Sequence, residues 1–218
     1  LRRLHAETPF DVLHAMWSDE TGALATWAGH WLNTPVVVSI AGGELVGFDD
    51  IAYGLQRSRF SRWTVNQALH GADAVIVACD YVKRLALKHN VPATKIYQIA
   101  FGVDTDVFKP DSNTGIPGHD LVHVASLVGI KDQTTLLKAI ADLEGVTLKI
   151  VGEGPERPRL DALAHTLKIN DKVTFAGKVH HLDLPEVYRS ASLNVLTSRH
   201  EGLGMVTLEA AACGVPTI

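Results

Sequence analysis

The chain has 218 residues, of which 46% are hydrophobic and 20% charged, a composition typical of a folded globular protein rather than a disordered one. Its net charge is −4, and its basic residues are spread over both halves, which argues against a dedicated nucleic-acid binder. Cys79 and Cys213 each lie in an apolar run, so we expect reduced thiols and a cytoplasmic location. No apolar run approaches the length of a membrane span.

Apolar, β-branched runs alternate with helical patterns along most of the chain. Strands are predicted at 34–41, 74–79, 95–100, 120–126, 147–152, 172–176, 192–197 and 215–218. Helices are predicted near 19–32, 52–70, 80–89, 132–144, 156–168, 184–190 and 205–213. Because several of these strands are continuously apolar, as strands covered by helices on both faces are, the sequence predicts an α/β fold of doubly wound parallel sheets.

A polar segment rich in Gly and Pro, near 104–117, interrupts this alternation. Such a segment is typical of a linker, so we expect two Rossmann-like domains, at 1–117 and 118–218. The chain begins at Leu1 rather than Met and ends within a predicted strand. We therefore expect a fragment that is truncated at both ends.

Glu201 and Glu209 are the most informative pair of residues. The segment 205–213 is helix-forming and apolar almost all round, which is typical of a buried helix, and a carboxylate within such a helix rarely lacks a partner. Gly202 and Gly204 let the backbone approach a ligand closely and direct N–H groups toward it. Two carboxylates on either side of a bound phosphate would suit the hydroxyl groups of a nucleotide-sugar.

The string that runs from Ser198 to Pro216, Ser-x-x-Glu-Gly-x-Gly…Glu-Ala-x-Ala-x-Gly-x-Pro, resembles the Glu-x7-Glu signature of retaining glycosyltransferases of family 4. Other stretches resemble that family too, so the likeness covers nearly the whole chain: a strand at Phe10–Ala15, a strand at Ala72–Cys79, and the Gly102–Pro110 stretch. The resemblance implies the GT-B fold and a hexosyltransferase-type enzyme. It implies retaining transfer of a sugar from a nucleotide-diphospho-sugar, UDP- or GDP-linked, to an unidentified acceptor.

The resemblance also implies roles for the second half of the chain. Glu201 would hold the hydroxyl groups of the donor sugar, and Lys131 would neutralise the leaving diphosphate, so these two are the predicted catalytic residues. Ser126 stands where the family has an arginine, and Asp132 where it has a glycine. Binding of the nucleotide-sugar is predicted for Glu209 (at the ribose), Gly204, Met205, Val206, Ser126, Gly177, Lys178, Val179, Gly42 and Gly43.

Three alternatives compete with this interpretation: an oxidoreductase, a metal-dependent protein and a non-catalytic binding module. The Gly-x-Gly turn at 152–154 lacks the third glycine of a dinucleotide fingerprint, because position 157 is Arg, which argues against an oxidoreductase. The scattered histidines meet no ligand spacing, so neither a metal nor another cofactor is expected. A non-catalytic nucleotide-sugar-binding module or partner subunit stays open, since Ser126 and Ala41 replace polar groups that are usual in the family.

The predicted partners follow from these roles. They are a nucleotide-sugar donor and a sugar, lipid-linked or small-molecule acceptor, with no nucleic acid. The stretch Arg57–Trp63 interleaves cations with aromatic residues. A solvated helix face is the default interpretation of that stretch, and contact with a phosphorylated acceptor, a lipid headgroup or RNA is the alternative. Peripheral contact with the cytoplasmic face of a membrane is accordingly kept as a hypothesis.

Overall fold

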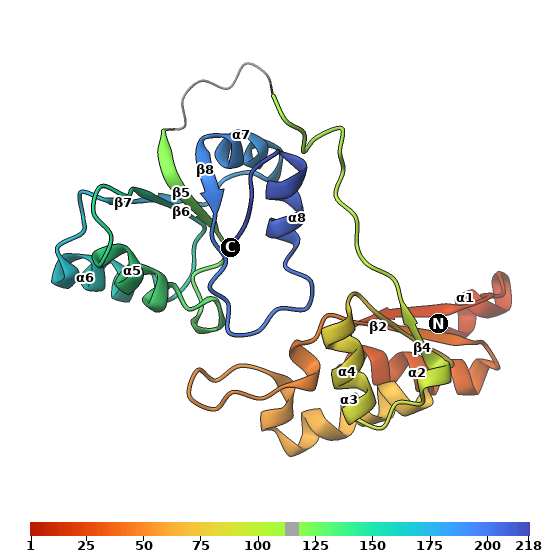
Figure 1. The fold of residues 1–218 in the computed structure, drawn as a ribbon. Helices are drawn as coiled ribbons and strands as arrows, with labels where there is room; N and C mark the ends of the chain where they lie inside the picture. The colour runs from red at the N-terminus through yellow and green to blue at the C-terminus, as the bar shows by residue number, and fades with distance from the viewer. Residues whose placement is uncertain (112–117) are drawn as a thin grey trace. The chain divides into compact units, whose positions relative to one another are not determined.

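The computed structural model describes residues 1–111 and 118–218, which form two compact units (Figure 1). The first unit comprises Leu1–Phe101 together with Glu201–Leu203, and the second comprises Gly102–His200 and Gly204–Ile218. Each unit contains one four-stranded parallel sheet with flanking helices, so the predicted α/β fold class is confirmed. Part of the predicted linker, 112–117, lies outside the described residues.

The sheet of the first unit has the strand order β1-β2-β3-β4. Its strands are β1 (Leu13–Met16), β2 (Val36–Ile40), β3 (Ala74–Val77) and β4 (Ile96–Gln98). The crossover helices are α2 (Glu20–Leu32), α3 (Arg59–Gly71) and α4 (Asp80–Lys88), and a short α1 (Arg2–Glu7) precedes β1. Because every crossover runs in the same direction, right-handed connections place all three crossover helices on one face of the sheet, as Figure 1 shows.

The core of the first unit lies between that face and the helices. Side chains of a strand point alternately to opposite faces, and those that point toward the helices are buried: Ala15, Val36, Val38, Ile40, Val75 and Val77. They pack with Val65 and Leu69 of α3 and Val82 of α4. The alternate positions Met16 and Tyr97, on the other face, are 47% and 54% exposed.

A helix is predicted at 52–70, but α3 begins only at Arg59, so the prediction is wrong for residues 52–58. Ala52 and Gly54 have positive φ, and Phe48 and Tyr53 pair through an antiparallel bridge, which closes a turn instead of a helix. A Cβ at Gly54 would lie 2.1 Å from the carbonyl oxygen of Val46. The periodicity also missed β1, which only the family resemblance indicated.

The sheet of the second unit has the order β7-β6-β5-β8, with strands β5 (His119–Val124), β6 (Leu148–Val151), β7 (Val173–Gly177) and β8 (Ala191–Asn194). Its helices are α5 (Gln133–Ala141), α6 (Arg157–Leu167), α7 (Leu184–Arg189) and α8 (Met205–Ala212). Strands β6 and β7 extend from one side of β5 and β8 lies on the other, so the winding reverses between β5 and β8. In Figure 1, α5 and α6 lie together on one side of this sheet, and α7 and α8 on the other, as a doubly wound sheet requires.

Two predictions for the end of the chain need correction. Residues 215–218 do not form a regular strand, because their ladder beside β8 contains one bridge, between Asn194 and Thr217. Helix α8 is less buried than its apolar sequence predicts: only Glu209 and Ala210 are buried. Ala210 packs into the core cluster that surrounds Tyr188, while the rest of α8 is half-buried or exposed.

Candidate functional site

The winding reversal between β5 and β8 marks the edge of the second sheet where open α/β folds bind ligands. The loops that follow these two strands meet there. The hydroxyl of Thr197 donates to the carbonyl oxygen of Lys131 at 3.0 Å, and the N–H of Arg199 donates to the carbonyl oxygen of Ile130 at 2.9 Å. The loop that carries the predicted catalytic Lys131 is therefore held against the loop that leads toward α8.

A buried hydrogen-bond network fixes the start of the Lys131 loop. His123, near the end of β5, donates from Nδ1 to the carbonyl oxygen of Val195 at 2.8 Å, and its Nε2 accepts from the amide nitrogen of Gln133 at 3.2 Å. The same amide nitrogen donates to the carbonyl oxygen of Ser126 at 3.1 Å. The network joins β5, the first turn of α5 and the loop after β8. His123 and Gln133 were not predicted from the sequence, although a histidine inside an apolar strand was an available signal.

Burial favours the neutral imidazole of His123. Burial lowers the pKa of His123, a hydrogen bond to Val195 opposes this effect, and the ammonium of Lys131 lowers the pKa further. A neutral ring can donate from one nitrogen and accept at the other, which is what its two partners require. His123 therefore acts here as a fixed connector between two loops.

Asp132 directly follows Lys131 and has a left-handed backbone, with φ of 46°. Its side chain caps α5 by accepting from the N–H of Thr135 at 3.3 Å and from the hydroxyl of Thr135 at 2.8 Å. Left-handed geometry favours glycine but also admits Asp and Asn. The aspartate that departs from the family pattern thus keeps the backbone that a glycine would adopt, and it adds a cap.

The turn at 152–154 packs against the same loop. A Cβ at Gly152 would lie 2.0 Å from the carbonyl oxygen of Ala125, and one at Gly154 would lie 2.3 Å from that of Leu127. The N–H of Leu127 also donates to the carbonyl oxygen of Glu153 at 2.9 Å. These glycines therefore serve the close approach of two backbone segments.

Glu209 is buried in α8, and its Oε2 accepts from the hydroxyl of Tyr188 on α7 at 2.7 Å. Burial raises the pKa of Tyr188, and the neighbouring Glu209 raises it further, so this phenol stays protonated and remains a donor. A carboxylate in an apolar helix was expected to have a partner, and in the structure that partner is Tyr188, which the sequence did not indicate. The carboxylate is thereby held in one orientation at the predicted ribose-binding position.

Helix α8, which carries Glu209, begins at Met205. Gly204 precedes the helix with φ of 67°, and a Cβ there would lie 3.2 Å from the side chain of Leu196. Met205 and Val206 are in the first turn of α8, where backbone N–H groups have no intrahelical acceptor and point out of the end of the helix. This geometry is compatible with the predicted contact to an anion, which stays a prediction.

Gly177 ends β7, and Lys178 and Val179 follow it, at the same edge of the sheet because the strands are all parallel. Gly177 has φ of 72°, and only the Glu153 carboxylate, at 3.9 Å, approaches its open side. Lys178 is exposed and Val179 half-buried. The contact of these residues with a nucleotide-sugar remains a prediction.

The remaining predicted residues belong to the first unit. At the end of β2, the buried carboxylate of Glu44 accepts from the N–H of Ala41 at 3.2 Å and from that of Gly42 at 2.7 Å. The N–H of Gly42 is therefore already bonded to Glu44. A Cβ at Gly43 would lie 2.6 Å from the hydroxyl of Tyr53. Their predicted contact with the donor remains a prediction.

Glu201–Leu203 also belong to the first unit by their contacts. The carbonyl oxygen of Gly202 accepts from the thiol of Cys79 at 2.7 Å, and a Cβ at Gly202 would lie 1.9 Å from the carbonyl oxygen of Ala41. Burial raises the pKa of Tyr53, and the charges of Glu201 and then Glu44 raise it further. The two carboxylates of the predicted pair therefore belong to different units.

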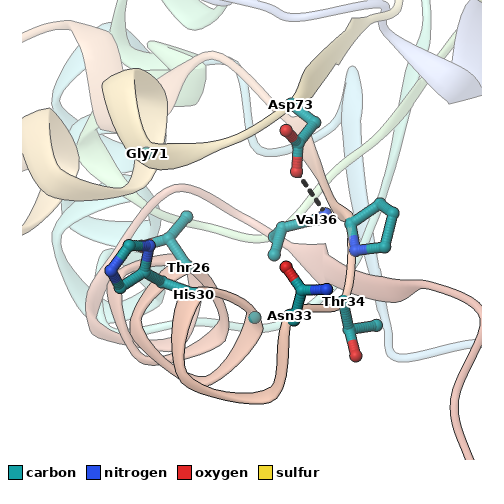
Figure 2. Close-up of a pocket in the computed structure, with 9 residues that line it drawn as sticks. Thr26, His30, Asn33, Thr34, Val36, Gly71 and Asp73 are labelled. Atoms are coloured by element: carbon teal, nitrogen blue, oxygen red, sulfur yellow. Dashed lines mark hydrogen bonds between the residues drawn. The ribbon is translucent and has the colours of Figure 1, made fainter.

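A polar cavity of about 330 Å³ lies elsewhere in the first unit, near the starts of β2 and β3 (Figure 2). Its lining includes Thr26 and His30 of α2, Asn33, Thr34 and Asp73. Figure 2 shows the carboxylate of Asp73 directed to the backbone of Val36, whose N–H it accepts at 2.8 Å. The cavity contains none of the predicted site residues. Within residues 1–111 and 118–218, no three His, Cys, Asp or Glu side chains are grouped so as to hold a metal ion.

Comparisons with known proteins follow the division into two units. The family model described as glycosyl transferases group 1 matches residues 108–218, and that of a glycosyl transferase 4-like domain matches residues 1–102. A D-inositol 3-phosphate glycosyltransferase of Mycolicibacterium smegmatis is 30% identical over 232 residues, covering 98% of this chain and 52% of that protein.

A second relative is a GDP-mannose-dependent alpha-(1-6)-phosphatidylinositol monomannoside mannosyltransferase of Mycobacterium tuberculosis. It is 33% identical over 168 residues, which cover 68% of this chain and 44% of that protein. The chain thus spans about half the length of the curated relatives it matches. Among solved structures, HepE of Anabaena, in complex with UDP and glucose, has 21% identity and a TM-score of 0.80 over 99% of this chain and 60% of its own. That likeness confirms the GT-B fold class, and the match over residues 108–218 shows that the chain belongs to the group 1 glycosyltransferases.

Proposed function

We propose that the protein is a retaining glycosyltransferase that moves a sugar from a nucleotide-diphospho-sugar to an acceptor hydroxyl. The observation that carries this proposal is the meeting of two loops at the winding reversal of the second sheet. The hydrogen bond from Thr197 to the carbonyl of Lys131 holds the only lysine of the β5–α5 loop beside the segment that leads toward α8. A cation and a helix N-terminus on adjoining loops are suited to a diphosphate.

The chemistry that we propose depends on neutralising charge on the leaving group. As the glycosidic bond breaks, negative charge grows on the diphosphate, and the Lys131 ammonium with the first-turn amides of α8 would stabilise it. Glu209, oriented by Tyr188, would accept hydrogen bonds from the ribose. Glu201 would hold the hydroxyl groups of the donor sugar. The acceptor hydroxyl would attack on the face from which the diphosphate departs and would pass its proton to the leaving phosphate, so the anomeric configuration is retained, as the resemblance to family 4 implies.

The relatives support this choice of donor and acceptor. HepE was solved with UDP and glucose, and the mycobacterial mannosyltransferase is named for GDP-mannose and a phosphatidylinositol mannoside. The relative from Mycolicibacterium smegmatis is named for D-inositol 3-phosphate. We therefore propose a UDP- or GDP-linked donor, and a sugar, a small polyol or a lipid-linked saccharide as acceptor.

A cytoplasmic location fits this proposal. Both cysteines, Cys79 and Cys213, are free thiols, as is usual in a reducing compartment. Among the helices of residues 1–111 and 118–218, none is long and apolar enough to cross a bilayer. We therefore propose that the protein meets its nucleotide-sugar donor in the cytoplasm.

The direct test is transfer by the full-length protein. UDP-glucose, UDP-galactose, UDP-N-acetylglucosamine and GDP-mannose are each incubated with inositol phosphate or phosphatidylinositol in EDTA, and nucleoside diphosphate release is measured. We expect one donor to be turned over without added metal, with an α-linked product by proton NMR. Binding of a nucleotide with no turnover of any donor would instead establish the non-catalytic alternative.

Matched variants assign the residues. Lys131→Ala should lower turnover by roughly 100-fold or more, because one charged stabiliser of the transition state is lost. Lys138→Ala, which removes an exposed lysine from α5 in the same unit, should leave turnover unchanged. Equal activity of the two variants would contradict the role of Lys131, and restoration of activity only by Mn²⁺ or Mg²⁺ would contradict the metal-free mechanism.

A further inference from the structure

The outer surface of α2 and α3 exposes an unusual number of large apolar side chains. Leu24, Trp27 and Trp31 follow one another along one stripe of α2, and they are 59%, 44% and 65% exposed. Phe60 and Trp63, one turn apart on α3, are 60% and 47% exposed. We call these five residues the aromatic face. Contiguous apolar surface of this kind marks interaction sites on soluble proteins.

Ring contacts show that the aromatic face is continuous across the two helices. The rings of Trp27 and Trp63 lie 5.7 Å apart, and those of Phe60 and Trp63 lie 6.1 Å apart. Helices α2 and α3 pack side by side on the same face of the sheet, as Figure 1 shows. Their other sides carry the buried residues of the core, so the aromatic face points away from it.

The charges around the aromatic face are mainly positive. Arg59 and Arg62 are exposed on α3, which contains no Asp or Glu. The guanidinium of Arg2 lies over the ring of Trp31, 5.1 Å from its centroid. The only acidic residue of α2 is Glu20, at its first position. This local excess contrasts with the net charge of −4 for the whole chain.

We propose that the aromatic face is a docking surface for an anionic lipid bilayer. Indole rings, apolar with one polar N–H, favour the boundary between lipid tails and headgroups, and arginines beside them can bind lipid phosphates. Charge complementarity favours this occupant over a second copy of the chain. A symmetric pair would bring two copies of the same positively charged surface together, and like charges repel.

A hollow beside the aromatic face suits the polar part of a lipid. It has a volume of about 310 Å³, adjoins the indole of Trp27, and is lined by Asn66, Gln67 and His70 of α3 and by His30 of α2. These side chains are uncharged or weakly basic donors, which matches the phosphate and hydroxyl groups of a headgroup. The surface lies outside the candidate transferase site, so the two proposals stand or fall separately.

The test measures partitioning of the protein onto vesicles of phosphatidylcholine with and without phosphatidylglycerol. We expect sedimentation with the anionic vesicles only, weakened by salt. Arg59→Gln/Arg62→Gln should lower the partition coefficient on the order of 30-fold, since each of the two arginines near an anionic surface contributes about 1 kcal/mol. Trp27→Ala/Trp63→Ala should lower it by a similar factor. Lys138→Gln on α5 and Tyr97→Ala on the opposite sheet face are the matched controls, and both should bind like the wild type.

Tryptophan fluorescence supplies a second readout. Trp17 lies outside the aromatic face, so in Trp17→Phe all remaining tryptophans are Trp27, Trp31 and Trp63. Brominated lipid should quench their emission strongly in anionic vesicles. Equal partitioning of wild type, face variants and controls, or an absence of quenching, would overturn the proposal. So would a dimer in solution that Trp27→Ala/Trp63→Ala dissociates, because the face would then bind a second copy. Circular dichroism shows that each variant is folded, and transfer to a soluble acceptor should be unchanged in all of them.

Discussion

At the scale of single residues, the hydrogen bond between Tyr188 and Glu209 gives the clearest stability prediction. Tyr188→Phe keeps the ring but removes the donor to a buried carboxylate, so we expect a loss of ~1.5–3 kcal/mol of unfolding free energy in urea titrations. Tyr97→Phe, which alters an exposed phenol, is the control. Unchanged stability of Tyr188→Phe would mean that this bond contributes nothing net.

The pH dependence of the same pair has a definite sign. The pKa of Tyr188 is raised in the folded state above its unfolded value of about 10. Its contribution is therefore fully present below about pH 10 and is lost as the pH rises further. The stability difference between the wild type and Tyr188→Phe should be constant from about pH 7 to about pH 9 and should shrink above about pH 10.

Asp132 combines a helix cap with a left-handed backbone, and substitutions can separate the two contributions. Asp132→Gly loses the cap but relieves the backbone, whereas Asp132→Ala loses the cap and keeps the strained geometry. We expect Ala to cost ~1–2 kcal/mol more than Gly in unfolding free energy, and Asn to be close to the wild type. Equal losses for Ala and Gly would show that the positive φ costs nothing at this position.

At the scale of elements, His123 joins β5, α5 and the loop after β8 through a neutral ring. Its folded pKa lies below the unfolded value of about 6.5, so its contribution is present above that pH and is lost as the pH falls. His123→Asn should be less stable than the wild type by ~1–3 kcal/mol near pH 7.5. This difference should narrow toward pH ~5. A constant difference over that range in thermal or urea unfolding would contradict the neutral-ring assignment.

The turn between β6 and α6 tests how closely the loops pack. Gly152→Ala places a methyl group against the carbonyl oxygen of Ala125 at a backbone φ of 138°, so we expect a loss of ~2 kcal/mol or more. Gly118→Ala is the control, because no atom of residues 1–111 or 118–218 lies within 4 Å of its added Cβ. Comparable unfolding midpoints for the two variants would show that the turn adapts at little cost.

Elements whose local pattern agrees with their packing were predictable from the sequence. The strands β2, β3, β5 and β6 are short apolar runs bounded by turn residues. Three of them lie inside their predicted segments, and β5 begins one residue before its predicted start. The start of α3 was not predictable, because it depends on the bridge between Phe48 and Tyr53, which no periodicity encodes. The family resemblance predicted roles for Glu209 and Lys131, and these roles stay predictions, whereas the contacts of Tyr188 and His123 join elements distant in the sequence.

At the scale of the whole molecule, the two units divide the chemistry that we propose. The second unit holds Lys131, Glu209 and the loops at the winding reversal, which together would bind the nucleotide diphosphate. The first unit holds the turn after β2 and the aromatic face, the latter proposed to dock on a bilayer. Together, the two proposals predict a donor taken from solution and an acceptor taken from a membrane surface.

The central claim is that the second unit binds the nucleotide, and calorimetric titration of the protein with UDP and GDP tests it most directly. We predict saturable binding of one of the two nucleotides. Lys131→Ala and Glu209→Ala should each weaken it by roughly 10-fold or more, since each removes a charged partner worth ~1.5–3 kcal/mol, while Lys138→Ala binds like the wild type. Binding of neither nucleotide, or the same affinity in all four proteins, would contradict the account.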